Sequence, residues 1–70
     1  MVKLSARNVF KGKVKSIHDG AVNSEVIVQL PAGIGIVSII TKTAAQKLAL
    51  REGKEVYAII KATNVILGLD

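Results

Sequence analysis

One short segment combines side chains that suit a small oxyanion. A hydroxyl, a guanidinium and a side-chain amide stand within four residues, at Ser5, Ala6, Arg7 and Asn8. An oxyanion site needs several convergent donors and one or two cations rather than an apolar slot. Anion binding and an ordinary capped turn are the two explanations that this segment leaves open.

Two further segments offer donors of the same kind. Lys61, Ala62 and Thr63 combine an ammonium, a hydroxyl and backbone N–H groups at a point where a strand is expected to end. The loop at residues 20–24 follows a tight turn, and its backbone amides could form a concavity that binds an anion. The alternatives are again a capped turn and a plain connecting loop.

Enzymatic catalysis and a bare metal site are excluded by composition. With no Cys and one His, the chain can form no disulfide framework, no thiolate zinc site and no His-based metal cage. His18 is interpreted as a turn residue, with a pH-sensitive contact as the alternative. We predict no catalytic residues. The five acidic residues are expected to be solvated or locally paired: Asp19, Glu25, Glu52, Glu55 and Asp70.

Length and hydrophobicity together favour an oligomer. A chain of 70 residues forms one domain, spanning residues 1–70, and its core alone is marginal. Half of the residues are hydrophobic, which is more than so small a core can cover. Because exposed apolar surface is usually covered by a partner, we expect a homo-oligomer.

The charge balance points to an anionic partner. The formal net charge is +5, which suits nucleic acid, a membrane surface or a small oxyanion. A basic OB-fold module that binds single-stranded nucleic acid stacks bases on aromatic side chains, but only Phe10 and Tyr57 are present, and Phe10 is predicted to be in the core.

No apolar run approaches the ~20 residues that span a bilayer, and no secretory signal is recognised, so a cytoplasmic protein without membrane contact is expected.

The secondary-structure pattern predicts a mainly all-β fold. Val, Ile and Thr recur in short alternating runs, and Ala, Gln, Lys and Leu form one helical run between the third and fourth of them. This order predicts a five-stranded OB-fold-like barrel with one short helix. The strands are expected at residues 9–17, 25–30, 34–40, 55–60 and 65–67, and the helix at residues 43–48, with Thr41 or Thr43 as its cap.

Several local features refine that prediction. Gly12 inside the first strand suggests a bulge or a bend, and residues 18–20 suggest an Asp-Gly turn with a positive backbone angle. Val26, Val28 and Leu30 are expected on one face of the second strand. Residues 36–40 are apolar on both faces, which is typical of a strand buried on both sides, in one chain or between chains. Because the first and fourth strands pair in an OB-like order, residues 5–8 and 61–63 are expected to meet.

The chain as a whole resembles the molbindins, small cytoplasmic molybdate- and tungstate-binding proteins also called Mop proteins. The resemblance covers residues 4–68, and its motifs stand at residues 5–8, 10–12, 20–26, 38–41, 53–56 and 60–63. It implies an OB-like fold, a hexamer built as a trimer of dimers, and oxyanion sites between subunits. It implies no organic cofactor, and a role in molybdenum storage and homeostasis.

The resemblance also implies a set of site residues. The Ser-Ala-Arg and Lys-Ala-Thr segments correspond to the family's molybdate-binding segments, and a neighbouring subunit would contribute the Val-Asn-Ser turn. Ala44 stands where many relatives have Ser, which removes one possible donor. Thr63 keeps the hydroxyl of the Ser that is common at its position. The implied oxyanion-binding residues are Ser5, Ala6, Arg7, Lys61, Ala62, Thr63, Val22, Asn23, Ser24 and Thr41.

Overall fold

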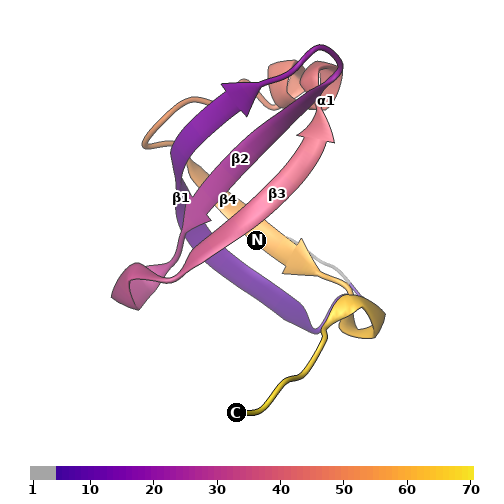
Figure 1. Ribbon diagram of the computed structural model, residues 1–70. Helices are drawn as coiled ribbons and strands as arrows, with labels where there is room; N and C mark the ends of the chain where they lie inside the picture. The colour runs from indigo at the N-terminus through magenta and orange to yellow at the C-terminus, as the bar shows by residue number, and fades with distance from the viewer. Residues whose placement is uncertain (1–4) are drawn as a thin grey trace.

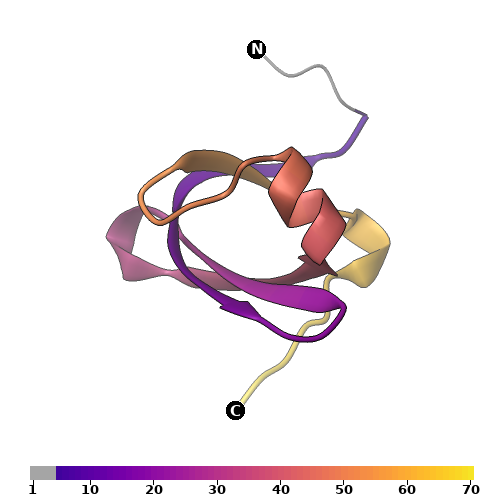
Figure 2. The ribbon, with the colours of Figure 1, turned by 90° about the horizontal axis from the view of Figure 1, so that it is seen from above.

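The computed structural model describes residues 5–70 as one curled antiparallel sheet with a short helix at one end (Figure 1). The strands are β1 (Asn8–Asp19), β2 (Asn23–Gln29), β3 (Gly35–Thr41) and β4 (Glu55–Ile60). The sheet order is β3-β2-β1-β4, so the first strand pairs with the fourth as expected. Viewed from above, the strands curve around a common centre (Figure 2). The predicted mainly-β class is confirmed.

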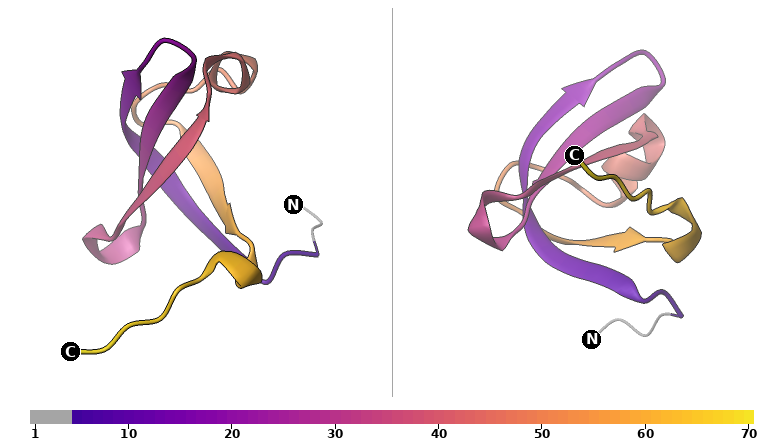
Figure 3. Two further views of the ribbon diagram at one scale, coloured as in Figure 1. Left: turned by 45° about the vertical axis from the view of Figure 1, so that its right-hand side comes forward. Right: turned by 60° about the horizontal axis from the view of Figure 1, so that its bottom comes forward.

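Within residues 5–70 the sheet has four strands, and the fifth strand predicted at residues 65–67 was wrong. After β4 the chain makes a single 3-10 turn, η2 (Ala62–Asn64), and then continues as an extended tail that leaves the sheet (Figure 3). Ile66 is 92% exposed, and Leu67 and Leu69 are equally open to solvent. β-branched residues favour extended backbone, but a strand also needs a hydrogen-bonding neighbour. In the described chain the tail has none, so β3 and β4 both remain open edges.

The core is small and lies on the concave face of the sheet. Val14, Val26, Val28 and Leu30 are buried, which confirms the predicted inward face of the second strand. The partly buried side chains around them come from all parts of the fold: Ile17, Ile36, Ile40, Leu50 and Val56. So few buried side chains agree with the expectation that a single core of this size is marginal.

Gly12 allows β1 to pass very close to the end of β2. A Cβ atom at this position would lie 2.7 Å from the carbonyl oxygen of Gln29 and 2.9 Å from side-chain carbons of Leu30 and Val28. The predicted irregularity is real but lies further along, because the β1–β2 register shifts between Val14 and Ser16. Glycine is therefore required at position 12 because β1 and the end of β2 approach closely there, and the bulge lies a few residues later in β1.

The turn after β1 begins later than predicted. His18 and Asp19 belong to β1, where they pair with Glu25 and Ser24 of β2, so His18 is not a turn residue. The turn comprises residues 20–22 and is closed by the N–H of Gly20, which donates to the carbonyl of Asn23 at 2.7 Å. Among the described residues, Gly20 is not one of the positions with positive φ. Cross-strand pairing therefore outweighed the local Asp-Gly preference.

The turn after β2 occupies the gap between the strands predicted at residues 25–30 and 34–40. The chain forms a 3-10 turn, η1 (Pro31–Gly33), in which Ala32 and Gly33 both adopt positive φ.

Several apolar side chains of the sheet are exposed to solvent. Phe10 is 42% exposed, so its predicted place in the core was wrong. Val37 and Ile39, on the outer face of β3, are also exposed, which excludes burial of both faces within one chain.

Helix α1 (Lys42–Lys47) begins and ends one residue before the predicted bounds. Thr41 caps its start, since the Thr41 Oγ1 accepts the N–H of Ala44 at 3.0 Å. The Nζ of Lys54 donates to the carbonyl of Leu48 at 2.6 Å, so this cation closes the other end of the helix. None of the helices in residues 5–70 has the length and apolarity to cross a membrane.

Candidate anion-binding site

The two segments at the start of β1 and the end of β4 lie side by side, as expected. Asn8 and Ile60 are paired across the two strands, and the side-chain amide of Asn8 donates to the carbonyl of Ile60 at 3.2 Å. Arg7 directly precedes this pair and Lys61 directly follows it. Figures 1 and 3 show the beginning of β1 next to η2. We call residues 5–8 and 60–63 the arginine end.

The arginine end presents donors that no other described group uses. Ser5, Arg7, Lys61 and Thr63 are exposed, and Ala6 is half-buried. Within residues 5–70 the backbone N–H groups of Ala62 and Thr63 donate to no acceptor, because they stand where the β4 ladder stops.

The two cations of the arginine end are also unpaired in the described chain. The ion pair found in residues 5–70 joins Lys11 and Glu55 at 3.1 Å and involves neither Arg7 nor Lys61. The arginine end therefore offers two cations, two hydroxyls and two amides, and all of them are hydrogen-bond donors.

The other predicted residues meet at the opposite end of the sheet. Asn23 pairs with Thr41 across β2 and β3, and the N–H of Lys42 donates to the carbonyl of Val22 at 2.9 Å. These contacts hold the β1–β2 turn against the start of α1 (Figure 1). We call residues 19–24 with 41–42 the turn end. In the part of the chain that the structure describes, the amides of Ala21 and Val22 donate to no acceptor.

Ser24 differs from its neighbours in the turn end. Its exposed fraction is 0%, and its hydroxyl donates to Oδ1 of Asp19 at 2.5 Å. The hydroxyl hydrogen is thus directed to a carboxylate of the same chain, and Asp19, which is exposed, is engaged in this local pair. The signal that could have revealed this pair is the hairpin itself, which places Asp19 opposite Ser24. A direct part for Ser24 in anion binding stays a prediction.

Thr41 retains the ability to donate. Its Oγ1 accepts the Ala44 amide, so the hydroxyl hydrogen is not used by that bond. The exposed side chain therefore can cap α1 and donate to an external acceptor at the same time. The geometry is therefore compatible with both roles predicted for Thr41, capping the helix and binding the anion.

The two ends do not meet within one chain. β1, twelve residues long, begins at the arginine end and finishes at the turn end, and Figure 3 shows the two groups at opposite extremes of the sheet. The predicted residues therefore form two half-sites: Ser5, Ala6, Arg7, Lys61, Ala62 and Thr63 in one, and Val22, Asn23, Ser24 and Thr41 in the other.

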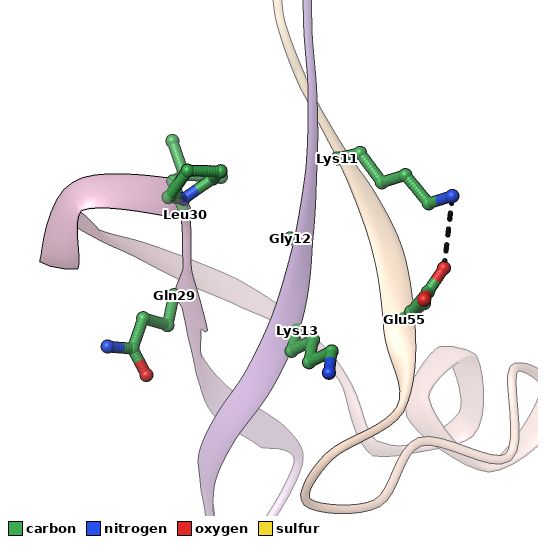
Figure 4. Close-up of a pocket in the computed structure, with 7 residues that line it drawn as sticks. Lys11, Gly12, Lys13, Gln29, Leu30 and Glu55 are labelled. Carbon is green, nitrogen blue, oxygen red and sulfur yellow. Dashed lines mark ion pairs between the residues drawn. The ribbon is translucent and has the colours of Figure 1, made fainter.

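Three hollows of the described surface lie mainly outside the arginine end, and only Ile60 of that end lines one of them. A hollow of about 540 Å³ crosses β1 between the end of β2 and the start of β4 (Figure 4). There the Lys11 ammonium points to Glu55, so an anion would face a carboxylate as well as cations. A second hollow, of about 360 Å³, is mainly apolar and opens between the β3 and β4 edges. A third, of about 160 Å³, lies beside the turn end and includes Asp19 and Lys42.

A bare metal ion finds no ligand cluster in the described chain. Residues 5–70 contain no group of three His, Cys, Asp or Glu side chains placed to hold one. The donor set of both ends instead suits a group that only accepts hydrogen bonds.

Comparison with known proteins adds an independent line of evidence. A family model for the TOBE domain matches residues 4–67. A probable molybdenum-pterin-binding protein of Haemophilus influenzae is 46% identical over 69 residues, which cover 99% of this chain and 100% of that protein. The structure of MopII from Clostridium pasteurianum is similar, with a TM-score of 0.91 and 37% identity over 96% of this chain and 100% of that one.

A structure of the cytoplasmic molybdate-binding protein ModG, with molybdate bound, is also similar. The TM-score is 0.94 and the identity 49%, over 99% of this chain and 49% of that chain. The fold described above, with its OB-like curl, is thus shared with MopII and with the molybdate-binding protein ModG.

Proposed function

The chain belongs to the TOBE-domain family, and we propose on that basis that it binds molybdate or tungstate as an intact oxyanion. The arginine end supports this proposal most strongly. It gathers Arg7, Lys61 and unused amide and hydroxyl donors beside one strand pair. Molybdate is a tetrahedral dianion without protons at neutral pH, so each of its oxygens accepts and none donates. A site made only of donors fits that ion.

The same chemistry predicts selectivity. Hydrogen phosphate carries a proton at neutral pH, and the cations and free amides of the arginine end offer that proton no acceptor. Sulfate is also a pure acceptor but is smaller, so its rejection must depend on the spacing of the donors. The names of several relatives include a pterin. We propose the oxyanion alone as ligand, since the chain's two aromatic rings, Phe10 and Tyr57, both lie within the strands and not at either half-site.

We further propose that the sites form between subunits of a homo-oligomer, a hexamer arranged as a trimer of dimers. The two half-sites stand at opposite ends of β1, so a site that uses both needs two chains. The apolar tail with Ile66 and Leu67, and the bare β3 and β4 edges, support association, because such surfaces are usually covered by a partner.

In the cell, we propose a non-enzymatic role in storage and homeostasis of molybdenum in the cytoplasm. The two half-sites gather cations, hydroxyls and free amides, which suit holding an anion rather than transforming it. The cytoplasmic location is supported by ModG, the solved relative described as cytoplasmic.

Isothermal titration with molybdate, tungstate, sulfate and phosphate tests the proposal, with light scattering to measure the assembly mass. We expect tight binding of the first two ions, weak binding of the others, and the mass of about six chains that the family resemblance implies. Binding should change little with salt, whereas nucleic-acid binding falls steeply as counterions are released. Absence of heat with molybdate would remove the proposal and leave the basic OB-fold module as the next candidate.

A further inference from the structure

We infer that Asp19 is a positioning residue for the turn end, acting through its hydrogen bond with Ser24. This inference rests on the proposed function, because it concerns how the free amides of Ala21 and Val22 are presented to an oxyanion. Ser24 is completely buried and its hydroxyl donates to Asp19 at 2.5 Å. The pair joins the last residue of β1 to the second residue of β2, directly across the base of the turn.

The rest of the turn is tied down on both sides of these amides. The N–H of Gly20 donates to the carbonyl of Asn23 at 2.7 Å, and the carbonyl of Val22 accepts the N–H of Lys42 at 2.9 Å. The amides of Ala21 and Val22 lie between these two bonds and are left without an acceptor in the described chain. A short loop is normally adaptable, so fixing it before the ligand arrives lowers the cost of binding.

A carboxylate near an anion site is unexpected on charge alone. Asp19 would repel a dianion, yet it is the group to which the buried hydroxyl donates. Asp19 therefore has two opposing effects. It accepts a hydrogen bond that orders the turn, and it carries a negative charge that opposes the ligand. Asp19→Asn keeps an oxygen that accepts from Ser24 and removes the charge, whereas Asp19→Ala and Ser24→Ala both remove the bond.

The first test is titration of the assembled protein with molybdate. We expect Asp19→Ala and Ser24→Ala each to weaken binding by about tenfold, since a hydrogen bond to a charged group contributes on this scale. The double variant should lose no more than either single variant. Asp19→Asn should bind as tightly as the wild type or more tightly. Glu52→Ala, which removes an exposed carboxylate in another turn, is the control for lost charge.

The second test does not depend on molybdate. Amide hydrogen exchange should become faster at Gly20 and Lys42 in Asp19→Ala and return to wild-type rates in Asp19→Asn. Val14, whose N–H donates to the carbonyl of Lys54 at 2.9 Å, is the control amide within each variant.

The two tests fail in different ways. Wild-type protein that does not bind molybdate, with exchange as expected, overturns the proposed function and leaves Asp19 as an ordering residue of the turn. The inference itself is overturned if Asp19→Asn loses as much affinity as Asp19→Ala, if the two bond-removing variants bind normally, or if exchange at Gly20 is unchanged.

Discussion

The arginine end and the turn end are both expected to contact the anion, but they are built in opposite ways. The arginine end relies on exposed side chains, Arg7 and Lys61 above all, that flank the Asn8–Ile60 pair at the end of the β1–β4 ladder. The turn end relies on backbone amides held in place by a buried hydroxyl and two backbone bonds. Charge is therefore concentrated at one end and preorganised geometry at the other.

This difference is consistent with the proposal that the two ends belong to a site shared between chains. An exposed cation stays hydrated and carries no desolvation penalty in the free chain, whereas burying an unpaired charge is strongly unfavourable. Assembly can then bring exposed cations of one chain to ordered amides of another, with the dianion between them. On this view the arginine end determines most of the affinity for the anion, and the turn end determines the shape of the binding site.

Replacing Arg7 should have the largest effect. Arg7→Ala removes a forked pair of charge-assisted hydrogen bonds, and we expect molybdate affinity to fall by about tenfold to a hundredfold. The molybdate affinity of Arg7→Lys should lie between those of the wild type and Arg7→Ala, because lysine keeps the charge but loses the forked pair of hydrogen bonds. Titration calorimetry measures both, with the exposed Arg51→Ala as control. Wild-type affinity in Arg7→Ala would exclude Arg7 from the site.

Replacing Lys61 should have the next largest effect. Its ammonium acts as a single point charge, so Lys61→Ala is expected to weaken binding by about tenfold. Lys15→Ala removes an exposed ammonium from the outer side of the sheet and should bind normally. Equal losses in the two variants would mean that general charge, and not a site at the arginine end, attracts the anion.

Thr41 offers a test at the turn end in which stability and binding separate. Thr41→Val removes the cap of α1 and should lower the free energy of unfolding by about 1 kcal/mol. Thr41→Asn should restore the cap but not a hydroxyl. If Thr41 also binds the anion, urea unfolding recovers in Thr41→Asn while molybdate affinity does not. Recovery of both quantities would limit Thr41 to capping.

The smallest effect is expected outside both ends. The hydrogen bond and the charge of Glu55 raise the pKa of Lys11 above its ordinary value of 10.5. A raised pKa stabilises the fold below pH 10.5, and this contribution disappears as the pH rises through the raised pKa. Because the pair is exposed, Lys11→Met should leave molybdate affinity and neutral-pH unfolding almost unchanged.

Alkaline unfolding provides the check on that pair. Urea midpoints of wild type and Lys11→Met, measured on both sides of the lysine titration, should converge at high pH, with Lys13→Met as the neighbouring control. A large loss of affinity in Lys11→Met would instead place the hollow of Figure 4 within the anion site.

The sequence predicted the features that depend on local pattern. β4 has the predicted bounds because Val56, Ala58 and Ile60 alternate with outward residues, and this period is a property of the strand alone. The meeting of residues 5–8 and 61–63 also followed, once the first strand was expected to pair with the fourth.

The features that were missed depend on pairing between distant residues. The late start of the β1–β2 turn reflects the pairing of His18 with Glu25, which outweighs the preference of Asp-Gly. The predicted fifth strand has suitable residues, but in the described chain the tail leaves the sheet and pairs with neither of the open edges, β3 or β4. The Asp19–Ser24 bond requires the same hairpin register together with full burial of Ser24, and neither is visible in composition or spacing.

The central claim is that one anion site combines the arginine end of one chain with the turn end of another. A mixed assembly tests it most directly, prepared by refolding Arg7→Ala/Lys61→Ala chains together with Asn23→Ala/Ser24→Ala chains and confirmed as mixed by native mass spectrometry. Each variant alone should bind molybdate weakly. The mixture should regain a set of sites with wild-type affinity, because some interfaces then pair two intact ends. A mixture that binds no better than its separate components, or strong binding by either variant alone, would contradict the claim.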